Sequence, residues 1–79
     1  MTQLADRVID VITKELRMQQ GVVTLESNFV EDLGTDSLDA LEIVVALEDE
    51  FKIILPDTMH EQIKTVQDAV NAVLQLIKK

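Results

Sequence analysis

One serine in this sequence has neighbours that favour a role in chemistry. Ser37 follows Gly34, Thr35 and Asp36 and precedes Leu38 and Asp39. Gly34 can adopt a backbone conformation that is closed to other residues, and Asp36 or Ser37 can cap the amides of a helix that follows. The spacing predicts a tight turn that opens a helix and leaves the Ser37 hydroxyl in water. From the residue types alone, a helix cap is the ordinary role of such a serine.

The chain lacks the usual parts of an enzyme. The single histidine, His60, has no Ser–His–carboxylate spacing around it, and an isolated His on a short polar helix is most often a surface residue. The absence of cysteine excludes a disulfide framework, a Cys zinc site and a cysteine nucleophile. The acidic cluster does not match a calcium-binding D-x-D-x-D-G loop. We therefore expect no catalysis and no dedicated metal site, although loose divalent-cation screening stays open at Glu31, Asp32, Asp36 and Asp39.

The charge is informative mainly through its placement. The net charge is −8, yet the nine acids between Met18 and Phe51 have no basic residue among them. Such a block excludes nucleic acid as a direct partner. It is either a solvated face or a docking surface, and its position around Ser37 favours docking of basic partners.

The elements that must position Ser37 begin with a helix from about Leu4 to Met18. Its apolar stripe, at helical spacing, consists of Leu4, Val8, Val11, Ile12 and Leu16. A long connection from Gln19 to Gly34 follows. It carries enough apolar residues to be pinned across the core. The expected anchors are Val22, Val23, Leu25, Phe29, Val30 and Leu33.

The second helix is predicted from Ser37 to about Phe51. At helical spacing, the core side of this helix consists of Ala40, Ile43, Val44, Leu47 and Phe51. Three apolar residues, Leu38, Leu41 and Val45, lie on the opposite side among carboxylates. Such residues are either ordinary exposed apolar side chains or part of a binding face, and their alignment with Ser37 fits a binding face better.

The last third of the chain predicts one short and one longer helix. Pro56 ends an apolar connection, and Asp57 to Ile63 forms one or two turns with Met59 and Ile63 inward. Thr65 and Asp68 form a capping box at the start of the last helix. Its inward stripe is Val66, Ala69, Val70, Val73, Leu74 and Ile77, and Lys78 and Lys79 suit its carboxyl end.

These elements predict an all-α fold, a small up-and-down bundle of three main helices plus one short helix. Residues 1–79 are expected to form a single small domain, monomeric and unexported, hence cytoplasmic. No apolar run approaches the length of a membrane span.

Three segments of the sequence resemble the acyl carrier protein family. They are F-V-E-D-L-G at residues 29–34, D-S-L-D at 36–39 with Glu42, and A-L-E-D-E-F at 46–51. The similarity continues through Leu55-Pro56-Asp57, Ile63 and Thr65-Val66, so it covers nearly the whole chain.

The resemblance implies a function for each part of the chain. Ser37 is the attachment residue for 4′-phosphopantetheine, which a phosphopantetheinyl transferase (holo-synthase) adds from coenzyme A and whose thiol holds acyl chains. The second helix is the recognition element for basic faces of synthesis enzymes, through Asp36, Leu38, Asp39, Leu41, Glu42, Val45, Glu48 and Asp49. If the helices part slightly, acyl methylenes can enter the aliphatic core, each contributing about 0.8 kcal/mol. The expected lining of this acyl pocket is Leu47, Phe51, Leu55 and Ile63.

The pathway stays open between two alternatives. A free-standing carrier of fatty-acid synthesis is the first choice, and a carrier of a polyketide or other specialised pathway is the second. Residues 58–62 are less acidic, and residues 52–55 more apolar, than is usual in the family, and both segments lie near the expected acyl exit. From a different class, an unmodified acidic adaptor would bind basic proteins through Leu38, Leu41 and Val45, and a calcium-responsive module would bind calcium tightly.

Overall fold

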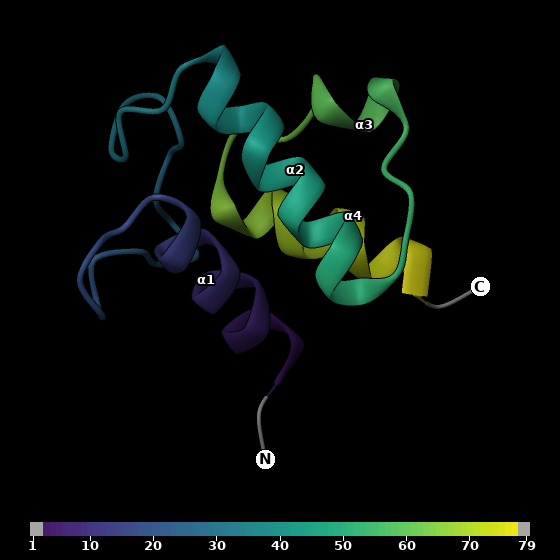
Figure 1. The fold of residues 1–79 in the computed structure, drawn as a ribbon, viewed down its shortest axis with the longest axis horizontal. Helices are drawn as coiled ribbons and strands as arrows, with labels where there is room; N and C mark the ends of the chain where they lie inside the picture. The colour runs from purple at the N-terminus through teal and green to yellow at the C-terminus, as the bar shows by residue number, and fades with distance from the viewer. Residues whose placement is uncertain (1–2, 78–79) are drawn as a thin grey trace.

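The computed structural model describes residues 3–77 and contains four helices. They are α1 (Leu4–Glu15), α2 (Ser37–Phe51), α3 (Asp57–His60) and α4 (Val66–Ile77). Helix α1 packs on α2 and α4, and α2 also contacts α4, which lies behind it in Figure 1. Within residues 3–77 the only β-type pairing is an isolated bridge between Asn28 and Thr65. The expected all-α bundle of three main helices and one short helix is confirmed.

Helix α1 ends three residues earlier than the sequence predicted. Arg17 adopts a left-handed conformation with φ 56°, which turns the chain away from the helix axis. The backbone N–H of Met18 then donates to the Thr13 carbonyl at 3.0 Å, and that of Arg17 to the Lys14 carbonyl at 3.2 Å. This pair of bonds is the pattern that usually follows a glycine at a helix end. An arginine therefore ends α1 in a backbone conformation that favours glycine.

The starts of α2 and α4 are set by reciprocal caps. The predicted box at α4 is present, since the Asp68 N–H donates to the Thr65 hydroxyl at 3.2 Å and the Thr65 N–H donates to the Asp68 carboxylate at 3.1 Å. The backbone N–H of Lys64 also donates to that carboxylate and is the main cause that lowers the pKa of Asp68 below its ordinary value. Helix α3 is shorter than predicted and ends at His60. The residues expected to close α4, Lys78 and Lys79, lie outside the described residues.

The core lies between α1, α2 and α4 and is almost wholly aliphatic. Fully buried side chains include Val8 and Ile12 of α1, Leu47 of α2 and Val73 of α4. The predicted stripe of α4 was wrong at its far end, where Leu74 and Ile77 are exposed. The inward face instead runs through Ala69, Ala72 and Leu76, at steps of three and then four residues, and of these Ala69 and Ala72 are buried and Leu76 is half-buried. Ala40 of α2, also predicted as core, is exposed because a cavity lies beneath it.

The connection between α1 and α2 is held against the body by apolar anchors and by backbone pairing. Val23, Phe29 and Leu33 are buried as expected, whereas Val22 and Val30 are exposed, so their prediction as anchors was wrong. The Phe29 N–H donates to the Lys64 carbonyl, and the Val66 N–H donates to the Ser27 carbonyl, both at 3.0 Å. These bonds fasten the segment that precedes Ser37 to the segment that opens α4.

Candidate functional site

Ser37 is the first residue of α2, and the cap that precedes it leaves its hydroxyl unused. The carboxylate of Asp36 accepts from the Asp39 backbone N–H at 2.9 Å, and the Asp39 carboxylate accepts from the Asp36 N–H at 3.3 Å. Of the two candidates for the cap, Asp36 therefore fills the role. Ser37 is exposed, and within residues 3–77 its hydroxyl makes no hydrogen bond to another side chain or to the backbone. The oxygen is thus presented to solvent.

The turn before Ser37 is fixed by Thr35 and Gly34. Gly34 has φ +66°, a left-handed conformation that favours glycine. Thr35 is buried, and both its hydroxyl and its backbone N–H donate to the Phe29 carbonyl, at 3.0 and 2.9 Å. Because Phe29 is itself buried, these bonds tie the entry of α2 to the core.

Asn28 organises the loop in front of that turn, a role the sequence reasoning missed. Its side-chain oxygen accepts from the backbone N–H groups of Val30 and Glu31, each at 3.0 Å. The Asp32 carboxylate in turn accepts from the Asn28 N–H at 2.7 Å. Asn and Asp commonly make such local turns, so the Asn28–Asp32 spacing was an available signal.

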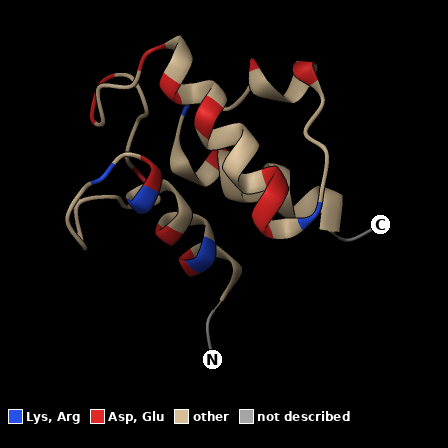
Figure 2. Cartoon of the chain, viewed as in Figure 1, with Lys and Arg blue, Asp and Glu red and all other residues tan. Residues whose placement is uncertain are grey.

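The outward side of α2 carries apolar and acidic side chains together. Leu38, Leu41 and Val45 are 63, 54 and 56% exposed. Glu42 and Asp49 are exposed on the same helix, and Figure 2 shows acidic residues along its length. Of the eight residues predicted to form the partner surface, six are exposed. A seventh, Asp39, is half-buried but lies at the exposed start of the helix.

Glu48 differs from the other acids of α2. It is half-buried, and its carboxylate accepts from the Leu55 backbone N–H at 2.8 Å. Its own backbone carbonyl accepts from Lys52 and Ile53. Glu48 therefore shapes the connection from α2 to α3, a role that its place in the acidic pattern did not predict.

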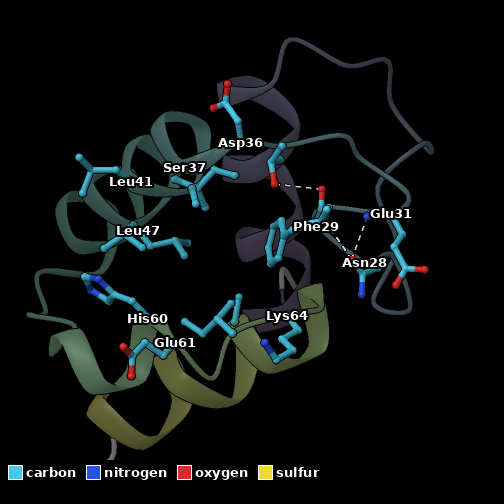
Figure 3. A pocket seen from close by; sticks show the side chains of 17 residues that line it. Asn28, Phe29, Glu31, Asp36, Ser37, Leu41, Leu47, His60, Glu61 and Lys64 are labelled. Atoms are coloured by element: carbon cyan, nitrogen blue, oxygen red, sulfur yellow. Dashed lines mark hydrogen bonds between the residues drawn. The ribbon is translucent and has the colours of Figure 1, made fainter.

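A cavity of about 820 Å³ extends from Ser37 between α2, α3 and the 28–31 loop. Figure 3 shows Leu47 and Phe29 directed into it from opposite sides, with His60 and Glu61 below and Ser37 and Leu41 above. The rest of its apolar lining consists of Val30, Ala40, Ile43, Val44, Ile63 and Ala69. Of the four residues expected to line an acyl pocket, Leu47 and Ile63 line this cavity.

The other two expected pocket residues lie elsewhere. Phe51 is half-buried between α1 and α2, where the Arg7 guanidinium stands 4.5 Å from its ring centroid and pairs with Glu50 at 3.1 Å. Leu55 is buried but is not part of the cavity lining. Neither Phe51 nor Leu55 therefore lines the cavity that begins at Ser37.

Two further findings bear on the site. In the described part of the chain, no three His, Asp or Glu side chains lie close enough together to hold a metal ion. None of the described helices combines the length and the apolar character that crossing a membrane requires.

Comparisons with known proteins place this geometry in a family. Residues 6–73 match the family model described as a phosphopantetheine attachment site. The fold is similar to the structure of a protein described as a putative acyl carrier protein from Mycobacterium tuberculosis. That match has a TM-score of 0.86 and 33% identity and covers 92% of this chain and 97% of the other. Since the family match spans most of the sequence, the chain belongs to the acyl carrier protein family, whose prosthetic group is 4′-phosphopantetheine.

Proposed function

We propose that this protein carries acyl chains as thioesters on a 4′-phosphopantetheine arm attached to Ser37. The observation that carries the proposal is the exposed Ser37 hydroxyl, which the Asp36–Asp39 cap leaves without an internal partner. The helix start favours a phosphodiester at this oxygen by about 0.3–1 kcal/mol, but the neighbouring carboxylates of Asp36 and Asp39 roughly cancel this effect. The covalent bond to Ser37, and not phosphate binding, would therefore hold the arm. The arm supplies the thiol to which an acyl group is attached, and the cavity that starts at Ser37 gives that group an apolar space.

We propose α2 as the surface that meets partner enzymes. Its exposed Leu38, Leu41 and Val45 offer apolar contact, and the acids around them, Glu42 and Asp49 among them, favour partners with Arg and Lys. A phosphopantetheinyl transferase and the acyl-processing enzymes would use this same face in turn.

Fatty-acid synthesis is the pathway we propose first, because the exposed surface of the cavity below Ser37 is mainly apolar. A polyketide or other specialised pathway remains the alternative. The single-domain organisation, the monomeric state and the cytoplasmic location expected from the sequence stay predictions.

The test uses the two serines of the chain as a matched pair. The protein is incubated with coenzyme A and a phosphopantetheinyl transferase, and its intact mass is measured. A mass increase in the parent and in Ser27→Ala, absent in Ser37→Ala, is the expected result. Ser27 is buried and bonds to the Thr24 hydroxyl, so its variant controls for loss of a serine without loss of the site. No mass increase in the parent would favour the unmodified adaptor instead.

A further inference from the structure

The backbone of Leu55 is held on both sides by side chains from two different helices. Its N–H donates to the Glu48 carboxylate of α2, and its carbonyl accepts from Nε2 of His60 in α3, each at 2.8 Å. We call this Glu48–Leu55–His60 arrangement the clasp. Leu55 is 3% exposed, so both bonds hold a buried backbone segment. A backbone group in this position costs stability if its partner is removed.

The bonding fixes the roles of the groups in the clasp. A carbonyl oxygen only accepts, so Nε2 of His60 carries the proton that it donates to Leu55. Its other ring nitrogen, Nδ1, lies 3.7 Å from the Asp57 carboxylate, which is fully exposed. His60 is only 28% exposed, in contrast to the surface histidine expected from the sequence.

Helix α3 has little else to hold it in place. It has four residues, none of them buried, and no side chain caps its start. The three longer helices pack on one another, whereas α3 makes few contacts with them (Figure 1). Met59 and Ile63 are half-buried against the core and supply its apolar attachment. The clasp is therefore a large part of what positions α3.

The position of α3 sets the width of the cavity. His60 and Glu61 form the wall opposite Ser37 and Leu41 in Figure 3, and Ile63 follows on the same side. The opposite wall belongs to α2, through Val44 and Leu47. Because Glu48 lies on α2 and His60 on α3, the clasp joins the two walls at their far end.

We propose that Glu48 and His60 are positioning residues that hold the α3 wall and thereby determine how well a bound acyl chain is enclosed. This inference rests on the proposed function, since it takes the cavity as the acyl site. Loss of either bond would let α3 move away from α2 and expose a long acyl chain, and with it the thioester, to solvent. A chain too short to reach α3 would be unaffected.

The test measures the rate at which hydroxylamine cleaves the thioester of the acyl-loaded protein. Butyryl and decanoyl forms are prepared from the corresponding acyl-coenzyme A with a phosphopantetheinyl transferase. His60→Ala and Glu48→Ala each remove one bond of the clasp, whereas His60→Gln keeps an N–H donor and Glu48→Gln keeps an oxygen acceptor. Gln62→Ala and Glu15→Ala, both at exposed positions outside the clasp, are the controls.

We expect decanoyl cleavage about fivefold faster in each alanine variant, the factor that corresponds to roughly 1 kcal/mol for one hydrogen bond. Butyryl cleavage should be unchanged, and the two Gln variants should return towards the parent rate. Equal decanoyl cleavage rates in the parent and the alanine variants, or equal acceleration of butyryl and decanoyl cleavage, would overturn the proposal that the clasp positions the α3 wall. A parent that fails to load would instead refute the proposed function, whereas a loaded parent whose decanoyl thioester is cleaved as fast as free decanoyl-pantetheine would refute the cavity as the acyl site.

Discussion

Asp36 combines a structural and an electrostatic role that two substitutions can separate. One carboxylate oxygen accepts from the Asp39 N–H at 2.9 Å, and the charge lies directly beside Ser37. Asp36→Asn keeps an oxygen that can accept this bond but removes the charge. Asp36→Ala removes both.

The stability effects of the two variants should differ clearly. Loss of a capping side chain costs about 1 kcal/mol. For a domain of this size that lowers Tm by about 4–8 °C. In Asp36→Asn the helix loses a favourable charge at its start, worth about 0.3–1 kcal/mol. It also loses the repulsion between the carboxylates of Asp36 and Asp39, which opposes that term. We therefore expect Asp36→Asn to melt within about 3 °C of the parent.

The loading effect should follow the charge and not the cap. A charge pair at about 4 Å in water contributes roughly 1 kcal/mol, or about fivefold in rate. Both variants should therefore be loaded at Ser37 about fivefold more slowly by the transferase at low salt. The difference from the parent should shrink as salt is added. Asp6→Asn removes a charge from the first turn of α1, outside the acidic block. It should leave loading unchanged and lower Tm only by the few degrees that correspond to a helix-start charge.

Thermal melting by circular dichroism and initial loading rates by mass spectrometry provide the two measurements. If Asp36→Asn melts as low as Asp36→Ala, the cap depends on the charge and not on an accepting oxygen. If Asp36→Asn is loaded at the parent rate, the charge of Asp36 takes no part in docking, and that part of the proposed surface is refuted.

Three further predictions concern stability. Arg17→Gly and Lys52→Gly should each raise Tm by a few degrees, because both residues have φ 56° and a residue with a side chain loses about 1–2 kcal/mol in this left-handed conformation. The greater freedom of glycine in the unfolded chain offsets part of this gain. A lower Tm in both variants would contradict the prediction. Because the pKa of Asp68 is lower in the folded than in the unfolded protein, its ionised carboxylate stabilises the fold. This stabilisation is fully present above the unfolded pKa of about 3.9 and is lost as the pH falls through the folded pKa. Urea unfolding across this range should therefore show less acid sensitivity in Asp68→Asn than in the parent, and equal sensitivity would rule out the linkage. Addition of about 0.5 M NaCl should raise Tm by screening the acidic block between Met18 and Phe51, and an unchanged Tm would show that these charges do not limit folding.

The parts of the fold that were predictable are those set by local pattern. The bounds of α2 and the box of Thr65 and Asp68 follow from cap residues and helical spacing, which act within a few residues. The end of α1 was missed because no sequence signal marks an arginine that takes a left-handed conformation. Such a position is favourable only through the bonds that the following turn makes with the helix end.

The errors in burial have a different cause. Val30 and Ala40 have the apolar type and spacing of core residues, yet both are exposed. They line the cavity that begins at Ser37, so no core packs against them. A pattern of apolar residues indicates which faces avoid water in general but does not distinguish a filled core from a cavity wall.

The exposure of Ser37 at the start of α2 was predictable from the sequence, whereas the separate roles of the acids of α2 were not. Sequence pattern treats every carboxylate near Ser37 as equivalent, whereas the structure gives some of them internal partners. A carboxylate has about four lone-pair positions, so one bond to a backbone N–H leaves Asp36 and Asp39 able to accept from a partner's Arg or Lys. Glu48 is half-buried and holds the Leu55 segment, so its removal should affect partners through the shape of the α2–α3 connection. Added salt should distinguish the two kinds of acid. It weakens a charge contact between Asp36 or Asp39 and a partner, but it does not reverse a backbone shift caused by loss of Glu48.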